Sequence, residues 1–333
     1  MVAAIPVQRN RVKMRALVQE GSGTADVLHI REIDRPEPTD GGVLIRVHAA
    51  SVNALDWHLV HGGRGFAIIT KLMRQPPAPP IRGADVSGVV EAVGESVTVF
   101  RPGDEVFGIG RGTFAEYTVG VERGLQHKPA ELSFEQAAAI GIAALTALQA
   151  VRDHGQVRPG DRVLVHGAGG GVGTFAVQFA KAFGAHVTAV TSVRNVEVVG
   201  SLGPDRVLVL SDQGFRHDRY DVIVDVAATR SIWSMLRLLT PAGRYVVTGA
   251  PKGSTMGLLM RVVWARVLAR FDRRVVNFAA RSKRDDLGTV ARMVVEGKAR
   301  VAIDRMYPLD EAAEAVRYVG TDQARAKVVV TVP

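Results

Sequence analysis

A glycine-rich run, HGAGGGVG at residues 166–173, carries the clearest chemical meaning in this 333-residue sequence. It lies between a short apolar run, Arg162–His166, and a segment with apolar side chains at helical spacing, Val172–Phe183. Glycines let a backbone approach a pyrophosphate, and the amides at the start of a helix favour its negative charge. Strand, glycines, helix and next strand follow one another within about thirty residues, so the run predicts a dinucleotide site.

The spacing of the glycines indicates which residues would contact the dinucleotide. Counting back from Gly173, the pattern reads alanine, any residue, glycine, any two residues, glycine, so that alanine replaces the usual first glycine. A tight turn without a ligand is the alternative interpretation. The residues expected at the cofactor are Ala168, Gly170, Gly171, Val172 and Gly173.

The end of the second strand distinguishes between the two nicotinamide cofactors. A site for NAD usually presents Asp or Glu roughly 20 residues after the glycines, to accept from the ribose hydroxyls. Here the sequence gives Ser192, Arg194 and Asn195 and no acid. A hydroxyl and a guanidinium suit a 2′-phosphate, so the sequence predicts NADPH, with a solvated arginine as the alternative for Arg194.

Composition excludes several classes of protein. With 47% hydrophobic and 23% charged residues, wholesale disorder is excluded, and the absence of cysteine rules out a disulfide scaffold, a thiolate nucleophile and cysteine-ligated zinc. The net charge of +9 is spread along the chain, which favours a basic surface that attracts an anionic cofactor over nucleic-acid binding. No apolar run reaches the ~20 residues of a membrane span, and the N-terminus lacks a secretory signal. A soluble cytoplasmic protein is expected.

The elements that position these residues fall into three zones. Up to about His127, short alternating runs such as Val43–Ala49 and Val86–Val93 predict an antiparallel, barrel-like zone. Strands then alternate with helices, which predicts a parallel sheet covered on both faces. The polar, proline-tailed segment His61–Pro80 is expected to be a loop that shapes the substrate site. The expected parts are residues 1–127 (with 1–12 an extension), 128–274 and 275–333.

Individual elements can be expected from periodicity and turn residues. The expected helices are Phe134–Val151, Asp285–Glu296 and Leu309–Gly320. The expected strands of the second and third zones are His186–Thr191, Arg206–Leu210, Asp221–Asp225, Arg244–Thr248 and Lys327–Val332.

From Met14 to its end the sequence resembles the zinc-independent quinone oxidoreductases of the medium-chain dehydrogenase/reductase superfamily. The resemblance implies a GroES-like catalytic domain, built from both ends of the chain, around an inserted Rossmann domain with a doubly wound parallel sheet. The motifs that carry it are SVNALDW (51–57), RGADVSGVVEAVG (82–94), RPGDEVFG (101–108), GTFAEY (112–117), AGGGVGTFAVQFAKAFGAHV (168–187), PAGRYVVTGA (241–250) and GKARVAIDRMYPLDEAAEAVRY (297–318).

The sequence departs from the zinc-dependent relatives at the metal. Those enzymes ligate catalytic zinc with a cysteine and a histidine, and the matching positions here are Asn53 and Ala84. No metal is therefore expected, although His58 and His61, with acids nearby, leave a ligand-like pair as an alternative. Ala326 also stands where the family often has glycine in the closing turn.

The resemblance implies further site residues. Asn53 is expected to hydrogen-bond the cofactor or substrate near the nicotinamide, and Thr146 resembles the family threonine that faces it. His58 occupies the neighbourhood where related enzymes often place a tyrosine, and a histidine can donate a proton near neutral pH; water is the alternative donor. Thr248 and Gly249, within PAGRYVVTGA, are expected at the cofactor.

The expected function is metal-free hydride transfer from NADPH to a quinone or an α,β-unsaturated carbonyl. Two alternatives remain open. One is an enoyl-thioester reductase of the same superfamily. The other is a non-enzymatic NADPH-binding protein, regulatory or peripheral to a membrane, suggested by the basic, apolar segment 256–274; the border of a cleft between domains is the favoured role for that segment. The resemblance implies a homodimer, with a small molecule as substrate.

Overall fold

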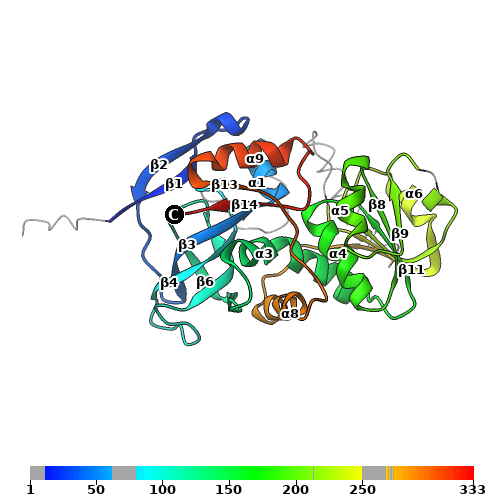
Figure 1. Cartoon of the computed structure of the whole chain (residues 1–333), viewed down its shortest axis with the longest axis horizontal. Helices are drawn as coiled ribbons and strands as arrows, with labels where there is room; N and C mark the ends of the chain where they lie inside the picture. Colours follow the sequence, from blue (N-terminus) through cyan, green and yellow to red (C-terminus); the bar gives the residue numbers. More distant parts are fainter. Residues whose placement is uncertain are drawn as a thin grey trace, which may run out of the picture.

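The computed structural model describes residues 12–61, 80–212, 214–249, 268, 270, 272 and 274–333. Within them, the strands form two six-stranded sheets and a two-stranded hairpin. Figure 1 shows one sheet at each end of the elongated molecule, with α3 (Phe134–Leu148) between them. The expected segments 61–80 and 256–274 lie almost wholly outside the described residues.

One sheet is parallel throughout and follows the order β12-β11-β10-β7-β8-β9. From β7 the chain adds β8 and β9 on one side of the sheet, and then crosses back to add β10, β11 and β12 on the other side. The two strands that lie side by side at this reversal define the switch point, where doubly wound sheets bind ligands at their carboxyl edge. The strands are β7 (Arg162–His166), β8 (His186–Thr191), β9 (Arg206–Val209), β10 (Tyr220–Asp225), β11 (Leu239–Val247) and β12 (Val275–Asn277).

This arrangement confirms the expected Rossmann fold and shifts one boundary. The return to the catalytic domain was expected after residue 274. The structure places it later, after β12, because β12 pairs in parallel with β11 and so belongs to the Rossmann sheet. The error arose because a three-residue strand carries too little periodicity to be assigned to either sheet. The helices and 3-10 turns of this domain are α4 (Gly171–Ala182), η3 (Val193–Asn195), α5 (Val196–Gly200), η4 (Gly214–Arg216) and α6 (Ile232–Leu236).

The second sheet forms the GroES-like catalytic domain. Strands β3 to β6 pair in sequence and β6 pairs back with β3, so the four close on one another. The chain returns at its end, where β14 pairs antiparallel with β3 and parallel with β13. The strands are β3 (Gly42–Val52), β4 (Asp85–Val93), β5 (Glu105–Arg111), β6 (Tyr117–His127), β13 (Ile303–Pro308) and β14 (Lys327–Thr331), and the hairpin is β1 (Lys13–Gln19) with β2 (Leu28–Asp34).

Helices of the catalytic domain come from both ends of the chain, as the resemblance implies. Figure 1 shows α1 and α9 together on the side of the hairpin, and α8 on the far side of α3. They and the short turns are η1 (Ala25–Val27), α1 (Ala54–His61), α8 (Arg284–Val295), η5 (Leu309–Glu311) and α9 (Ala312–Gly320).

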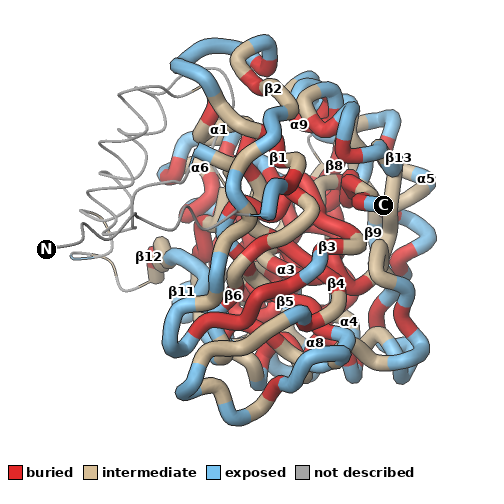
Figure 2. The backbone as a smooth tube through the Cα atoms, turned by 90° about the vertical axis from the view of Figure 1, so that its left-hand side faces the viewer, coloured by how far each residue is buried: buried red, intermediate tan, exposed pale blue. Residues whose placement is uncertain are grey.

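Helix α3 is the central element of the molecule. It begins with a capping box in which Ser133 and Gln136 exchange side-chain and backbone hydrogen bonds, and it continues into a π-helical turn, η2 (Gln149–His154). Figure 2 shows α3 and the strands around it as largely buried. Contrary to the sequence expectation, residues 134–154 are apolar and long enough to span a membrane, but 72% of the most apolar window is buried inside the protein, as in the core helix of a soluble protein.

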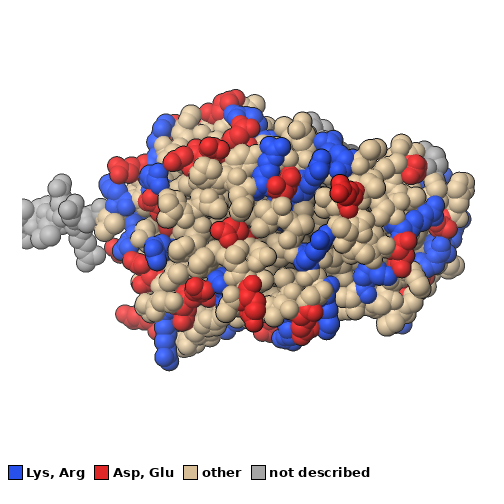
Figure 3. All heavy atoms as spheres, viewed as in Figure 1, with Lys and Arg blue, Asp and Glu red and all other residues tan. Residues whose placement is uncertain are grey.

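Charged side chains are mixed on the face that Figure 3 shows. Lysine and arginine side chains alternate with aspartate and glutamate side chains across both domains there. Surface ion pairs of the protein include Lys181 with Asp205 and Arg206 with Asp218. On this face the excess of +9 forms no continuous basic stripe of the kind that tracks a nucleic-acid backbone.

Candidate active site

The glycine-rich run forms the loop between β7 and α4 at the switch point. The amides of Gly167 and Ala168 both donate to the carbonyl of Val190 on β8, at 2.9 and 3.0 Å. A Cβ at Gly173 would lie 2.2 Å from the carbonyl oxygen of Gly167, so a side chain there would break the packing of helix on loop. A Cβ at Gly170 would meet nothing nearer than 3.9 Å, so the described chain leaves that position open.

Unsatisfied polar atoms around this loop fit a dinucleotide. Asn195 Oδ1, Thr248 Oγ1 and His166 Nε2 are buried and have no hydrogen-bond partner among the described residues. They lie just beyond or at the carboxyl ends of three strands of one sheet, β8, β11 and β7. Buried polar atoms nearly always have a partner, so this edge of the sheet suits a ligand with many polar groups.

The side chains expected at the 2′-phosphate lie on the turn after β8. Ser192 precedes η3 and is half-buried, whereas Arg194, within η3, is exposed and makes no hydrogen bond or ion pair with the described chain. Asn195 is buried. Gly169 faces it, because a Cβ on Gly169 would lie 2.3 Å from Asn195 Nδ2. Because no carboxylate of the described chain pairs with Arg194, its guanidinium is available to bind an anion.

A buried network beneath the loop escaped the sequence analysis. His166 Nδ1 lies 2.7 Å from Asp225 Oδ1, and the hydroxyl of Tyr245 donates to Asp225 Oδ2 at 2.6 Å. The amide of Ala228 also donates to this carboxylate. The network joins the carboxyl ends of β7 and β10 to β11 and so fixes the edge on which the glycine-rich loop stands.

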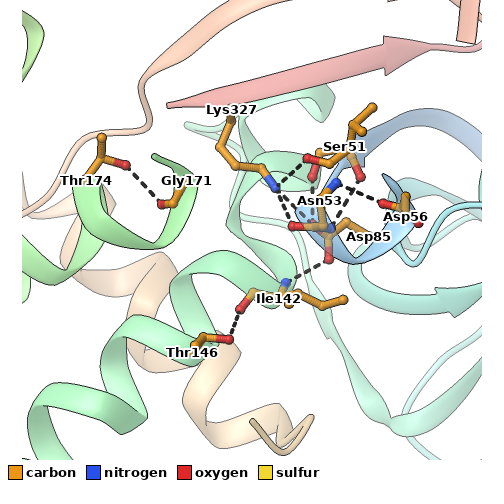
Figure 4. A network of polar contacts seen from close by, with 10 residues as sticks. Ser51, Asn53, Asp56, Asp85, Ile142, Thr146, Gly171, Thr174 and Lys327 are labelled. Carbon is orange, nitrogen blue, oxygen red and sulfur yellow. Dashed lines mark hydrogen bonds and ion pairs between the residues drawn. The ribbon is translucent and has the colours of Figure 1, made fainter. Parts of the chain in front are cut away.

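The catalytic-domain half of the site centres on Asn53, between β3 and α1. Its Nδ2 donates to Asp85 Oδ2 at 2.8 Å, and its Oδ1 accepts from Lys327 Nζ at 2.9 Å. Lys327 Nζ also lies 3.3 Å from Asp85 Oδ2, and Ser51 Oγ donates to the same oxygen at 2.7 Å. Figure 4 shows these side chains converging, with Lys327 reaching from β14 past the first turn of α4.

Asp85 also receives a bond from α3. Its Oδ1 accepts from the amide of Ile142 at 2.7 Å, where the backbone of Gly141 leaves helical geometry. A Cβ on Gly141 would lie 2.1 Å from that oxygen, so only glycine admits the carboxylate. Asp85 and Lys327 were not predicted as site residues; the one signal for Lys327 was that a lysine opens an apolar strand, and this alone does not distinguish a buried lysine from an exposed one.

Asp56 is a second buried carboxylate beside Asn53. It accepts from the amide of Asn53 at 2.8 Å. Burial raises the pKa of Asp56 to about 6, against the opposing effect of this bond and with a further rise from the charge of Asp85. The carboxylate holds the start of α1 in place, and it can change charge near neutral pH.

The loop and the catalytic domain meet at Ala326. Its amide donates to the carbonyl of Gly169 at 2.9 Å, and it forms a bridge with Gly170. Its φ of 58° lies in the left-handed region that favours glycine. The closing turn of this chain therefore holds an alanine in a backbone conformation that glycine adopts more readily.

Thr146 adjoins this network through Ile142, and His58 lies on α1 beside Trp57. The hydroxyl of Thr146 donates to the carbonyl of Ile142 at 2.7 Å, one turn earlier in α3, which leaves its oxygen able to accept. His58, on α1, makes an edge-to-face contact with Trp57 at 5.0 Å between ring centroids. His61 stacks on the same indole at 4.4 Å. The described residues contain no group of three or more histidine, aspartate or glutamate side chains that could hold a metal ion.

Comparisons with known proteins agree with this architecture. Residues 39–130 match the family described as alcohol dehydrogenase GroES-like domain, and residues 202–330 match the zinc-binding dehydrogenase family. The chloroplastic quinone-oxidoreductase QR1 of Triphysaria versicolor is 32% identical, over 95% of this chain and 98% of its own. The mitochondrial NAD(P)H oxidoreductase RTN4IP1 of Mus musculus is 34% identical, over 87% of this chain and 81% of its own.

A solved structure extends the likeness to the whole fold. The quinone oxidoreductase of Coxiella burnetii superposes with a TM-score of 0.84 at 30% identity, covering 97% of this chain and 100% of its own. Fold and site together define an oxidoreductase with a nicotinamide cofactor, built from a GroES-like and a Rossmann domain. The chain belongs to the quinone oxidoreductase branch of the medium-chain dehydrogenase/reductase superfamily.

Proposed function

We propose that the protein reduces quinones or α,β-unsaturated carbonyls with NADPH and without a catalytic metal. The observation that carries the proposal is the donor set at the catalytic centre. Where zinc-dependent relatives place metal ligands, this chain offers an amide, Asn53, bonded to an ammonium, Lys327. These groups polarise an oxygen more weakly than a bound Zn²⁺, so they suit acceptors that delocalise the charge of an added hydride.

The cofactor assignment is supported by the turn after β8. Ser192 and Arg194 are available to a 2′-phosphate, and no acid stands there to accept from ribose hydroxyls. Ala168, Gly170, Gly171, Val172 and Gly173 would hold the pyrophosphate, and Thr248 and Gly249 would lie against the nicotinamide half. When bound, NADPH supplies the hydride.

The chain's own residues have two tasks in this reaction. Asn53 would orient the nicotinamide or the substrate with the lone pair that remains on its Oδ1, because its two N–H groups point to Asp85 Oδ2 and the carbonyl of Ser51. A proton must then reach the reduced product, and His58 or water would donate it. Thr146 would contribute its hydroxyl oxygen as an acceptor next to the nicotinamide.

The test is a panel of hydride acceptors, with NADPH oxidation followed by absorbance. The panel holds a naphthoquinone, an enone, a saturated aldehyde and crotonyl-coenzyme A, and ethanol is tried with NADP⁺ in the reverse direction. We expect turnover with the quinone or the enone and little with the others. Faster reduction of the thioester would instead favour an enoyl-thioester reductase, and efficient ethanol oxidation would contradict the proposal.

The metal-free mechanism has its own control. Elemental analysis of the purified protein should find no stoichiometric zinc, and activity should survive a chelator such as EDTA. One tightly bound zinc per chain, removed only with loss of turnover, would overturn this part of the proposal.

We also propose a homodimer joined at the outer edge of β12, a cytoplasmic location and no stable attachment to membranes or nucleic acid. The support for the dimer is that β12 ends the order of described strands, so one side of it has no strand neighbour there. Sedimentation should give twice the 35.7 kDa chain mass; a monomer at micromolar concentration would refute it. Binding to anionic vesicles at low salt would contradict the proposal that the protein stays off membranes.

A further inference from the structure

Lys327 is a lysine whose burial needs an explanation. Only 2% of it is exposed, and taking an ammonium out of water is unfavourable unless it is paired and hydrogen-bonded. Asp85, fully buried, supplies the opposite charge at 3.3 Å, and Asn53 Oδ1 supplies the shortest bond at 2.9 Å. The carbonyl of Val52 is more distant, at 3.4 Å.

The ammonium and the carboxylate hold the Asn53 amide from opposite ends. Lys327 can only donate and an ionised Asp85 can only accept, so they bind Oδ1 and Nδ2 respectively and exclude the flipped amide. A flip would place Nδ2 against the ammonium and Oδ1 against the carboxylate. The pair therefore selects one orientation of the side chain that the proposed reaction needs.

The same lysine is attached to the cofactor loop. The preceding residue, Ala326, donates its amide to Gly169 O, and a Cβ on Gly171 would come within 3.0 Å of Lys327 Cδ. In Figure 4 the lysine lies between the start of α4 and the side chains of Asn53 and Asp85. One dipeptide, 326–327, thus links the loop that would hold the pyrophosphate to the amide beside the nicotinamide.

We propose that Lys327 is a positioning residue for hydride transfer: its ammonium, balanced by Asp85, fixes the orientation of the Asn53 amide relative to the cofactor loop. This inference rests on the proposed function. It goes beyond the proposed function because it assigns a role to the buried ion pair between Lys327 on β14 and Asp85 on β4.

A double-mutant cycle between Lys327 and Asn53 tests the proposal. Lys327→Met keeps the length of the side chain and removes the charge; it should lower kcat for the quinone about 100-fold, the size of a misplaced contact, and leave the KM for NADPH within about threefold. The lysine acts through the Asn53 amide. Adding Lys327→Met to the Asn53→Ala variant should therefore lower kcat by less than about threefold relative to Asn53→Ala alone. Full additivity of the two losses would overturn the proposal.

A purely structural role is separated by restoring charge balance. Lys327→Met alone leaves the Asp85 carboxylate buried without its counter-charge, whereas adding Asp85→Asn removes that charge and should recover the melting temperature. If Lys327 merely neutralises Asp85, the neutral pair regains turnover as well; we expect stability to return and kcat to remain low. Recovery of kcat would refute a positioning role.

The matched control is Lys128→Met. Lys128 also has an acidic partner, Glu105, and a side chain that is only 5% exposed, and it donates to the carbonyl of Leu132 at 2.7 Å. This variant should lose stability with kcat unchanged. The wild-type protein is measured beside the variants: absence of turnover there would remove the proposed function itself, whereas normal wild-type turnover with a fully active Lys327→Met variant would remove only the role of the lysine.

Discussion

Replacing Arg194 by alanine tests the choice of cofactor. The side chain is exposed on η3, directly after the carboxyl end of β8, and has no ion pair with the described chain. A phosphate would therefore displace water and no carboxylate when it binds. A hydrogen bond to a charged group contributes about 1.5–3 kcal/mol, and solvent screening of an exposed arginine keeps the contribution within that range.

The expected effect follows from this magnitude. Since 1.4 kcal/mol is a factor of ten in affinity, Arg194→Ala should weaken NADPH binding about ten- to a hundredfold. NADH has no 2′-phosphate, so its affinity should hardly change. Ser192→Asp should repel the phosphate, offer the ribose hydroxyls an acceptor and reverse the preference. Asn195→Ala should weaken NADPH binding less, because the amide is neutral and shorter.

The assay is titration of each variant with NADPH and with NADH by calorimetry at moderate salt. Arg158→Ala is the matched control, since Arg158 is also exposed but precedes β7, at the opposite edge of the sheet. It should leave both affinities unchanged. Equal affinity of the wild type for the two cofactors, or an equal loss for both in Arg194→Ala, would refute the assignment of NADPH.

Three further predictions concern stability and the loop. The pKa of Asp56 rises from 3.8 to about 6 on folding, so protonated Asp56 stabilises the fold below pH ~4 and this contribution is lost as pH rises to ~6. Asparagine does not titrate, so between pH 4 and pH 7 the free energy of unfolding of Asp56→Asn should increase relative to that of the wild type by on the order of 3 kcal/mol, as measured by denaturation at both pH values. Gly170→Ala should keep the melting temperature and abolish calorimetric cofactor binding, whereas Gly173→Ala should lower both; normal binding by Gly170→Ala would contradict the pyrophosphate site. Ala326→Gly should raise the free energy of unfolding in urea by about 0.5–1 kcal/mol, because it relieves a left-handed alanine, and a loss of stability would show that the alanine is unstrained.

The Rossmann half of the site could be predicted from sequence because its signals are local. The glycines, the helix that follows and the strands β7 and β8 are contiguous in the chain, and each has a period or a turn residue of its own. The expected strands Arg162–His166 and His186–Thr191 agree with β7 and β8. Ser192 and Arg194 could be predicted as cofactor contacts from their distance along the chain after the glycines.

The catalytic half could be predicted only in part. Asn53 came from a resemblance between motifs, but its two partners are far away in sequence: Lys327 and Asp85 are separated by 242 residues. Their contact depends on the antiparallel pairing of β14 with β3 and of β3 with β4, and no periodicity specifies register between distant strands. The His166 and Asp225 pair escaped notice for the same reason.

The central claim, direct hydride transfer to a conjugated acceptor, is tested most directly by following the hydride itself. The protein is incubated with an enone and NADPH deuterated on one or the other face of nicotinamide C4, and the product is examined by NMR. Because one face of a bound nicotinamide is turned to the substrate, we predict that a single one of the two labelled cofactors delivers deuterium, to the carbon β to the carbonyl. Deuterium at the carbonyl carbon, delivery from both faces, or product without label would contradict the account.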